Sequence, residues 1–84
     1  MNDCMITFRS VTPAQRGEKA LHRAGFACSI QRTPRWMEEQ GCGYSLRIQC
    51  QDVLHCTEIL VAAQIPFRKV YRRKENGKME EMSV

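Results

Sequence analysis

The sequence has no run of apolar residues near the ~18 that a membrane-spanning helix needs, so we expect no transmembrane segment and no membrane partner. It also has no basic stretch followed by an apolar run near Met1. We therefore expect no secretory signal and a cytosolic protein. A chain of 84 residues is too short for two lobes with a substrate cleft between them, so a single small domain is expected.

Metal-binding patterns are absent as well. The chain contains no Cys-x-x-Cys pair, which argues against a zinc ribbon and against a thioredoxin-like dithiol. Its two histidines are isolated: His22 stands alone on a helix face, and His55 points about 100° away from its neighbour Cys56 in a helix. We therefore expect neither a metal nor a cofactor.

What the chain does have is cysteine, with five in 84 residues. The odd number and the missing secretory signal favour free thiols over a disulfide framework. Cys28 and Cys56 fall on apolar faces and are expected to be small core residues. Cys4 precedes the first predicted strand, where it is expected to be exposed, and Cys50 lies at the junction of a strand and a helix.

Hydrophobic periodicity predicts the order β-α-β-β-α-β, which is typical of a ferredoxin-like α+β sandwich with two helices on one face of a four-stranded antiparallel sheet. Ser10 and Thr12 are both candidate N-caps of the first helix, Thr12 begins a capping-box pattern with Pro13 at the first helical position, and Gly25 is the expected left-handed end. The strands are expected at residues 5–9, 26–33, 43–49 and 67–72, and the helices at residues 13–24 and 51–64. The domain is expected to span residues 4–73, followed by a flexible polar tail over residues 74–84.

This topology places several loops at one end of the sheet. The first strand and the second strand run in the same direction, so their ends meet the start of the first helix and the start of the third strand. Residues 10–12, 33–35 and 41–43 are therefore expected to cluster there.

Cys42 is the best candidate for chemistry at that end. It lies between Gly41 and Gly43, which remove crowding around its thiol. The N-terminus of the first helix and the side chain of Arg35 would lower the thiol pKa from its usual ~8.5. The alternative is that Gly-Cys-Gly is a tight turn with an incidental cysteine.

Four segments together resemble the selenium/sulfur carrier protein-like family, a group of small bacterial and archaeal domains. The resemblance covers about residues 5 to 73. It rests on Phe8-Arg9-Ser10, on Thr33-Pro34-Arg35, on the run from Gly41 to Arg47 and on Tyr71-Arg72.

The resemblance implies a carrier or accessory protein more than a free-standing enzyme. In that role, Cys42 would hold sulfur or selenium as a persulfide or selenosulfide. The binding residues would be Ser10, Thr33, Arg35, Gly41 and Gly43. The implied partners are a donor such as a cysteine desulfurase and an acceptor enzyme, and a homodimer is compatible with the open sheet.

Two alternatives remain open. One is a ligand-binding or regulatory module that oligomerises through the open sheet face. The other is an RNA-binding adaptor that uses the basic run from Arg68 to Lys74, although these charges also suit a guarded edge strand. Strand alternation places Tyr44 with the core residues Leu46 and Ile48 rather than on an open stacking face, so we do not expect base stacking on the sheet, and a nucleic-acid partner is the less favoured alternative.

Overall fold

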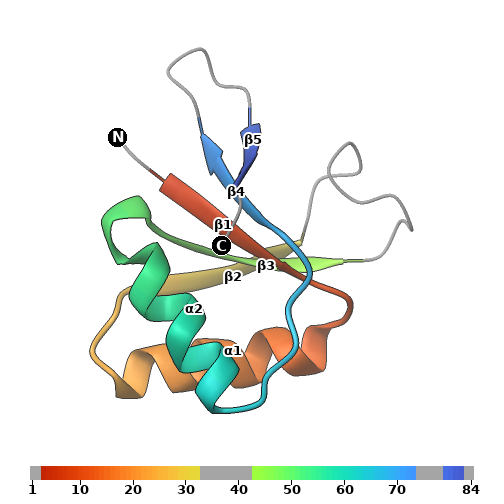
Figure 1. Ribbon diagram of the computed structural model, residues 1–84. Coiled ribbons are helices and arrows are strands. Elements are labelled where there is room, and N and C mark those ends of the chain that lie inside the picture. The colour runs from red at the N-terminus through yellow and green to blue at the C-terminus, as the bar shows by residue number, and fades with distance from the viewer. Residues whose placement is uncertain (1–2, 33–42, 74–78, 83–84) are drawn as a thin grey trace.

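The computed structural model describes residues 3–32, 43–73 and 79–82 (Figure 1). Over these ranges the chain forms five strands, two α-helices and one short 3₁₀ turn. In chain order they are β1 (Asp3–Phe8), α1 (Val11–Arg23), β2 (Cys28–Arg32), β3 (Tyr44–Gln49), η2 (Cys50–Asp52), α2 (Val53–Ala62), β4 (Val70–Arg73) and β5 (Met79–Met82).

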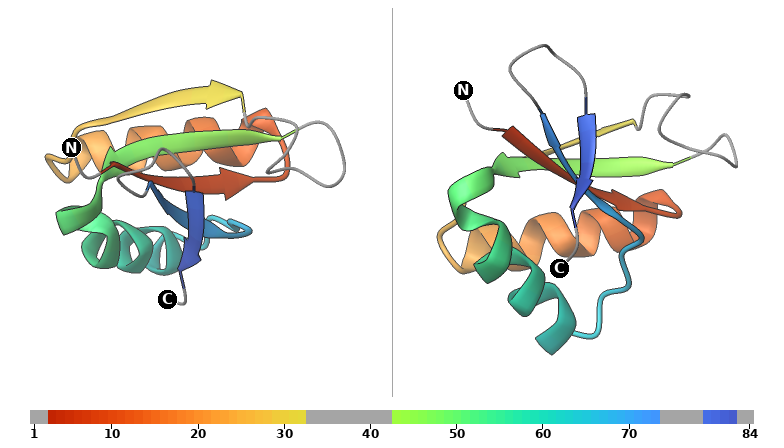
Figure 2. Two further views of the ribbon diagram at one scale, coloured as in Figure 1. Left: turned by 90° about the horizontal axis from the view of Figure 1, so that it is seen from above. Right: turned by 45° about the horizontal axis from the view of Figure 1, so that its top comes forward.

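The strands form one antiparallel sheet in the order β2-β3-β1-β4-β5. Both helices lie on the same face of this sheet, as the three views show (Figures 1 and 2). The expected α+β class, with two helices beside an antiparallel sheet, is therefore confirmed. The expected number of strands is wrong, because the sheet has five strands rather than four.

The additional strand is β5, which lies in the segment where the sequence predicted only a polar tail. It pairs with β4 in a register that runs from Val70 opposite Met82 to Arg73 opposite Met79. Opposite charges join the strands: Arg72 donates to Glu80 at 3.0 Å, and a second ion pair, 3.4 Å long, links Lys69 to Glu81. A strand with so little apolar alternation could not be recognised locally, because its stabilisation comes from cross-strand partners.

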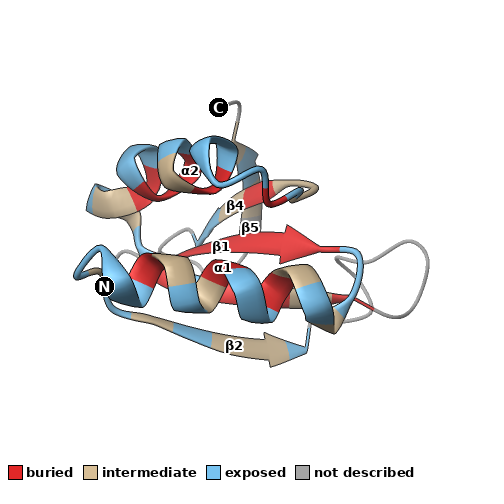
Figure 3. Ribbon diagram, turned by 90° about the horizontal axis from the view of Figure 1, so that it is seen from below, coloured by how far each residue is buried: buried red, intermediate tan, exposed pale blue. Residues whose placement is uncertain are grey.

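Alternation along the central strands decides which side chains enter the core. Cys4, Ile6 and Phe8 of β1 are all fully buried among the core residues. Leu46 and Ile48 of β3 follow the same alternation and join the same cluster. Buried segments of the helices face the sheet across this layer (Figure 3). The first strand thus begins earlier than predicted, and Cys4 is a core residue instead of an exposed one.

Gly17 lets α1 approach the sheet closely. A Cβ atom at this position would lie 3.2 Å from side-chain atoms of Phe8, Leu46 and Leu60. The helix therefore packs its backbone directly onto residues from both strands and from α2. This tight contact joins α1, α2 and the sheet in one core.

The ends of several elements differ from the predicted ones. Helix α1 begins at Val11 with Ser10 as its N-cap, two residues before the predicted start at Pro13. Gly25 has a φ angle of 90°, which confirms the predicted left-handed residue after this helix. Strand β4 begins at Val70 and not at residue 67. Within the described residues, no helix has the length and apolar character needed to cross a membrane.

Candidate functional site

One end of the sheet gathers the ends of three strands and the start of α1. Tyr44, the first residue of β3, is the register partner of Phe8 in β1 and of Arg32 in β2. The described chain stops after Arg32 at the end of β2 and resumes at Gly43 before β3, so both residues that flank positions 33–42 lie at this end. We call it the loop end of the sheet.

Two of the six predicted site residues lie in the described part of the chain, both at the loop end. Ser10 is exposed and has extended backbone angles, and its side chain makes no capping hydrogen bond to α1. Gly43 is buried directly before β3. The other four lie outside the described residues: Thr33, Arg35, Gly41 and Cys42.

Positive charge accumulates at the loop end. The guanidinium carbon of Arg32 lies 6.0 Å from the centre of the Tyr44 ring, a cation–π geometry that holds this charge at the base of the connection. Arg9 follows β1 and is exposed. The first turn of α1 contains no acidic residue, so nothing there offsets the partial positive charge of the helix N-terminus. The sequence analysis named Arg35 as the cation near Cys42 and missed Arg32, although Arg32 lies near the end of a predicted strand.

Two free thiols occur among the described residues, and both are poor nucleophiles. Burial, with a contribution from Glu18, raises the pKa of Cys28 to about 11. Burial, with contributions from Asp52 and Cys28, raises the pKa of Cys56 to about 11. Near neutral pH both groups remain protonated, and a protonated thiol neither attacks nor leaves readily. Their predicted role as core residues agrees with this environment.

Cys4 and Cys50 form a disulfide, which corrects the expectation that the cysteines are all free thiols. Their Cα atoms are 4.9 Å apart, although 46 positions separate them in the sequence. The bond joins β1 to the turn η2 that leads into α2, at the end of the sheet opposite the loop end. We call this the disulfide end. Cysteine count could not reveal the pair, because the pairing depends on how β1 and β3 align.

A shallow pocket of about 310 Å³ also lies near the disulfide end. The ion pair between Arg47 and Asp3, 2.6 Å long, crosses its lining. The start of β2, the end of β3 and the first residue of β1 surround it. Within the described ranges, no group of three or more His, Cys, Asp or Glu residues could hold a metal ion.

Comparison with known protein families assigns the chain. The sequence model of the family described as "Putative Se/S carrier protein-like" matches residues 3–72. The chain belongs to this family. The description of this family supports a carrier of selenium or sulfur as the general kind of function. A search among curated proteins gave no match.

The extent of the match separates two parts of this Se/S carrier-like chain. Strands β1 to β3, both helices and the whole connection 33–42 lie inside the matched range. Strand β4 ends one residue beyond it, and β5 lies entirely outside. Strand β5, which the sequence analysis did not predict, is therefore also the strand that lies outside the match to the family.

The aromatic platform of an RNA-recognition module does not form on the described sheet. Phe8 is fully buried, and Tyr44 packs against the core on the helix-covered side. Stacking on bases would need such rings on the opposite, open face.

Proposed function

We propose that this chain carries sulfur or selenium on the thiol of Cys42 and delivers the atom to a partner enzyme. The observation that carries this proposal is the state of the other four cysteines. Two are closed in a disulfide, and the other two have pKa values raised to about 11. This leaves Cys42, which lies outside the described residues and is indicated by its flanking glycines and by the family resemblance.

The charges at the loop end support an anionic intermediate. A terminal persulfide or hydroselenide is negatively charged near neutral pH, and cationic groups stabilise such anions. Arg32 marks the point at which the chain enters the connection, and Gly43 marks its return directly after Cys42. In this proposal Arg32 joins Arg35 as a source of positive charge for Cys42.

The transfer consists of two balanced exchange steps. First, the Cys42 thiolate attacks the outer sulfur of a donor persulfide, the donor S–S bond breaks, and the donor thiolate leaves. This leaves a persulfide on Cys42. Second, a nucleophile of the acceptor attacks the outer sulfur, and the Cys42 thiolate is released. A donor selenosulfide reacts in the same way and places a selenium atom on Cys42.

The proposed partners are larger enzymes that bring their own active sites. A domain of this size cannot enclose a reactive sulfur atom, so the atom would be transferred while the chain is bound to the partner enzyme. A cysteine desulfurase is the donor class that fits, because it forms a protein persulfide.

We interpret β1 to β4 with both helices as a ferredoxin-like sandwich to which β5 is added.

The test is to load the purified chain from a cysteine desulfurase supplied with cysteine. Intact-mass spectrometry counts the sulfur atoms gained, and peptide mapping without reductant locates them. The expected product is one added sulfur atom per chain, located on Cys42. A Cys42→Ser variant should lose nearly all loading.

Cys28→Ser is the matched control, because it removes a free thiol whose pKa is raised. It should load like the unchanged chain. Normal loading of the Cys42→Ser variant, or added sulfur that maps to Cys28 or Cys56, would disprove the proposal.

A further inference from the structure

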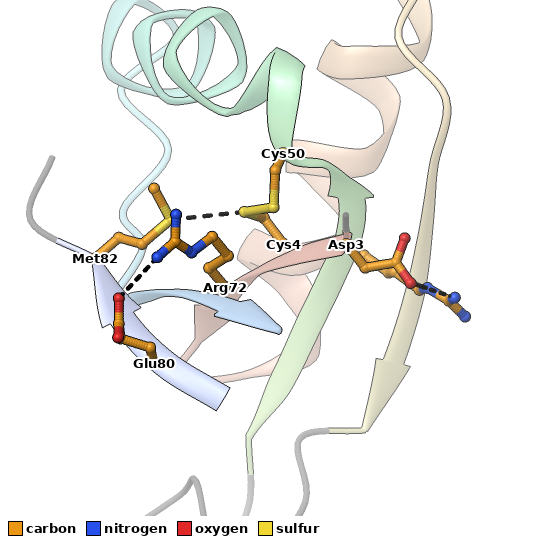
Figure 4. The surroundings of a disulfide bond; sticks show 7 residues. Asp3, Cys4, Cys50, Arg72, Glu80 and Met82 are labelled. Carbon is orange, nitrogen blue, oxygen red and sulfur yellow. Dashed lines mark hydrogen bonds and ion pairs between the residues drawn. A yellow bond between two sulfur atoms is a disulfide. The ribbon is translucent and has the colours of Figure 1, made fainter. Parts of the chain in front are cut away.

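The two residues of the disulfide differ in burial. Cys4, near the start of the central strand β1, is 0% exposed, whereas Cys50 at the start of η2 is only partly buried. The sulfur of Cys4 also contacts the sulfur of Met82 in β5, at 3.6 Å (Figure 4). The disulfide therefore joins a fully buried cysteine to a partly buried one.

This asymmetry determines how a thiol can open the bond. A thiolate attacks one sulfur of a disulfide and displaces the other, and access decides which sulfur is attacked. Cys4 is closed to attack by the sheet and by Met82. Attack is therefore directed to Cys50, and Cys4 becomes the leaving sulfur.

The sheet register places one cation on the same face as Cys4. Arg72 is the register partner of Cys4 on β4, so the two side chains lie on the same face of the sheet. Its guanidinium is held by Glu80 of β5 at 3.0 Å (Figure 4). A cation on this face offsets part of the cost that burial places on the Cys4 thiolate.

We propose that the Cys4–Cys50 disulfide is a thiol-exchange site that accepts thiolates of small molecules or proteins at Cys50. In the first step, a thiolate bonds to the Cys50 sulfur, the Cys4–Cys50 bond breaks, and Cys4 leaves as a thiolate. In the second step, another thiolate attacks the sulfur of the bound thiol and releases the Cys50 thiolate. The two thiols are oxidised to one disulfide, and the protein disulfide is reduced to two thiols, so the electrons balance.

This site is separate from the proposed carrier thiol. It lies at the disulfide end, whereas the connection that contains Cys42 begins and ends at the loop end. Opening the bond would release η2 and the start of α2 from β1. The anchoring of α2 would then respond to the thiol redox state.

The experiment uses glutathione as the probe. The folded chain is treated with reduced glutathione, the exchange is stopped with acid, and peptide mapping locates the trapped mixed disulfide. The expected product carries glutathione on Cys50 and none on Cys4. Glutathione on Cys4, equal labelling of both sulfurs, or a bond that opens only in denaturant would overturn the proposal.

A pair of variants tests the cover over Cys4. Met82→Ala removes the side chain that contacts the Cys4 sulfur, and we expect faster reduction together with some glutathione on Cys4. Met82→Leu is the matched control, because it keeps an apolar side chain of similar size over the Cys4 sulfur. Equal reduction rates and equal labelling for the two variants would show that β5 does not direct the attack. Loading of Cys42 is measured in parallel, so a failure here is distinguishable from a failure of the carrier proposal.

Discussion

The two ends of the sheet differ in their sulfur atoms and in their ion pairs. At the disulfide end, two sulfur atoms are joined covalently, and Asp3 and Glu80 pair with Arg47 and Arg72. At the loop end, two exposed arginines, Arg9 and Arg32, lie beside a helix start that has no acidic residue in its first turn. No ion pair joins either of these arginines to a carboxylate among the described residues.

The contrast separates two kinds of sulfur site. At the disulfide end, a covalent link joins β1 to η2, ion pairs join β1 to β3 and β4 to β5, and the proposed thiol exchange acts on the covalent link. At the loop end, the arginines would stabilise the anionic sulfur of the proposed carrier. A small domain can combine a thiol carrier with a stable core when the two demands fall on different ends of the same sheet.

The largest expected effect comes from removing the covalent link at the disulfide end. A Cys4→Ala/Cys50→Ala double variant should lose roughly 3–4 kcal/mol of unfolding free energy, because the bond closes a loop of 46 positions in the unfolded chain. Urea unfolding followed by circular dichroism measures the change. Loading of Cys42 in the folded variant should persist. Loss of loading together with unchanged stability would reverse the roles assigned to the two ends.

A larger side chain between α1 and the sheet should change both the stability of the chain and the reactivity of Cys42. Gly17→Val adds atoms where even a Cβ lies 3.2 Å from Phe8, Leu46 and Leu60, and overpacking of this kind costs about 1–3 kcal/mol. The same readouts, urea unfolding and reactivity of Cys42, should both change. Gln15→Val on the exposed side of α1 is the control for the lower helix propensity of valine. Equal stabilities of the two variants would rule out the close approach of α1.

A smaller effect distinguishes the arginines of the two ends. Arg32→Ala should slow alkylation of Cys42 at neutral pH by up to about fivefold, since a charge pair near water is worth ~1 kcal/mol. Arg47→Ala removes an arginine that pairs with Asp3 at the other end and should leave the rate unchanged. Alkylation is followed by intact-mass spectrometry with peptide mapping. Identical rates in both variants would remove Arg32 from the proposed site.

The smallest effect near neutral pH concerns the two free thiols, which change the stability of the chain only at alkaline pH. Cys28 and Cys56 have folded-state pKa values raised from 9.0 to about 11, so folding favours their neutral forms. Their contribution to stability is fully present below pH 9 and is lost as the pH rises towards 11. A Cys28→Ala/Cys56→Ala variant should therefore show a shallower decline of unfolding free energy across this interval. Parallel declines would indicate that the two thiols titrate normally in the folded chain.

Sequence patterns predicted the elements best where local rules decide the outcome. Alternation placed Leu46 and Ile48 on the core side of β3, and Gly25 marked the end of α1 through its left-handed backbone. The same alternation, extended backwards from Ile6, would have placed Cys4 in the core. Of the two candidate N-caps of α1 the chain uses Ser10, whereas the Thr12-Pro13 pattern predicted a helix start two residues too late.

The candidate site was predicted in part for the same reason. The topology alone brings Ser10 and Gly43 to the end of the sheet where β1 ends and β3 begins. Cys42 and Arg35 remain assignments from the sequence and from the family resemblance. The position of Arg32 over the Tyr44 ring could not be anticipated, because it depends on the β2–β3 register and on a side-chain conformation.

By itself, the sequence determined the α+β composition, the faces of the central strands and the membership in a Se/S carrier-like family. These properties follow from short-range periodicity and from motifs that are read along the chain. Only the tertiary structure decided that Cys4 bonds to Cys50 and that Met79–Met82 joins β4 as a fifth strand. Both depend on which distant segments become neighbours, and the free energy that selects them arises only when the core and the sheet have assembled.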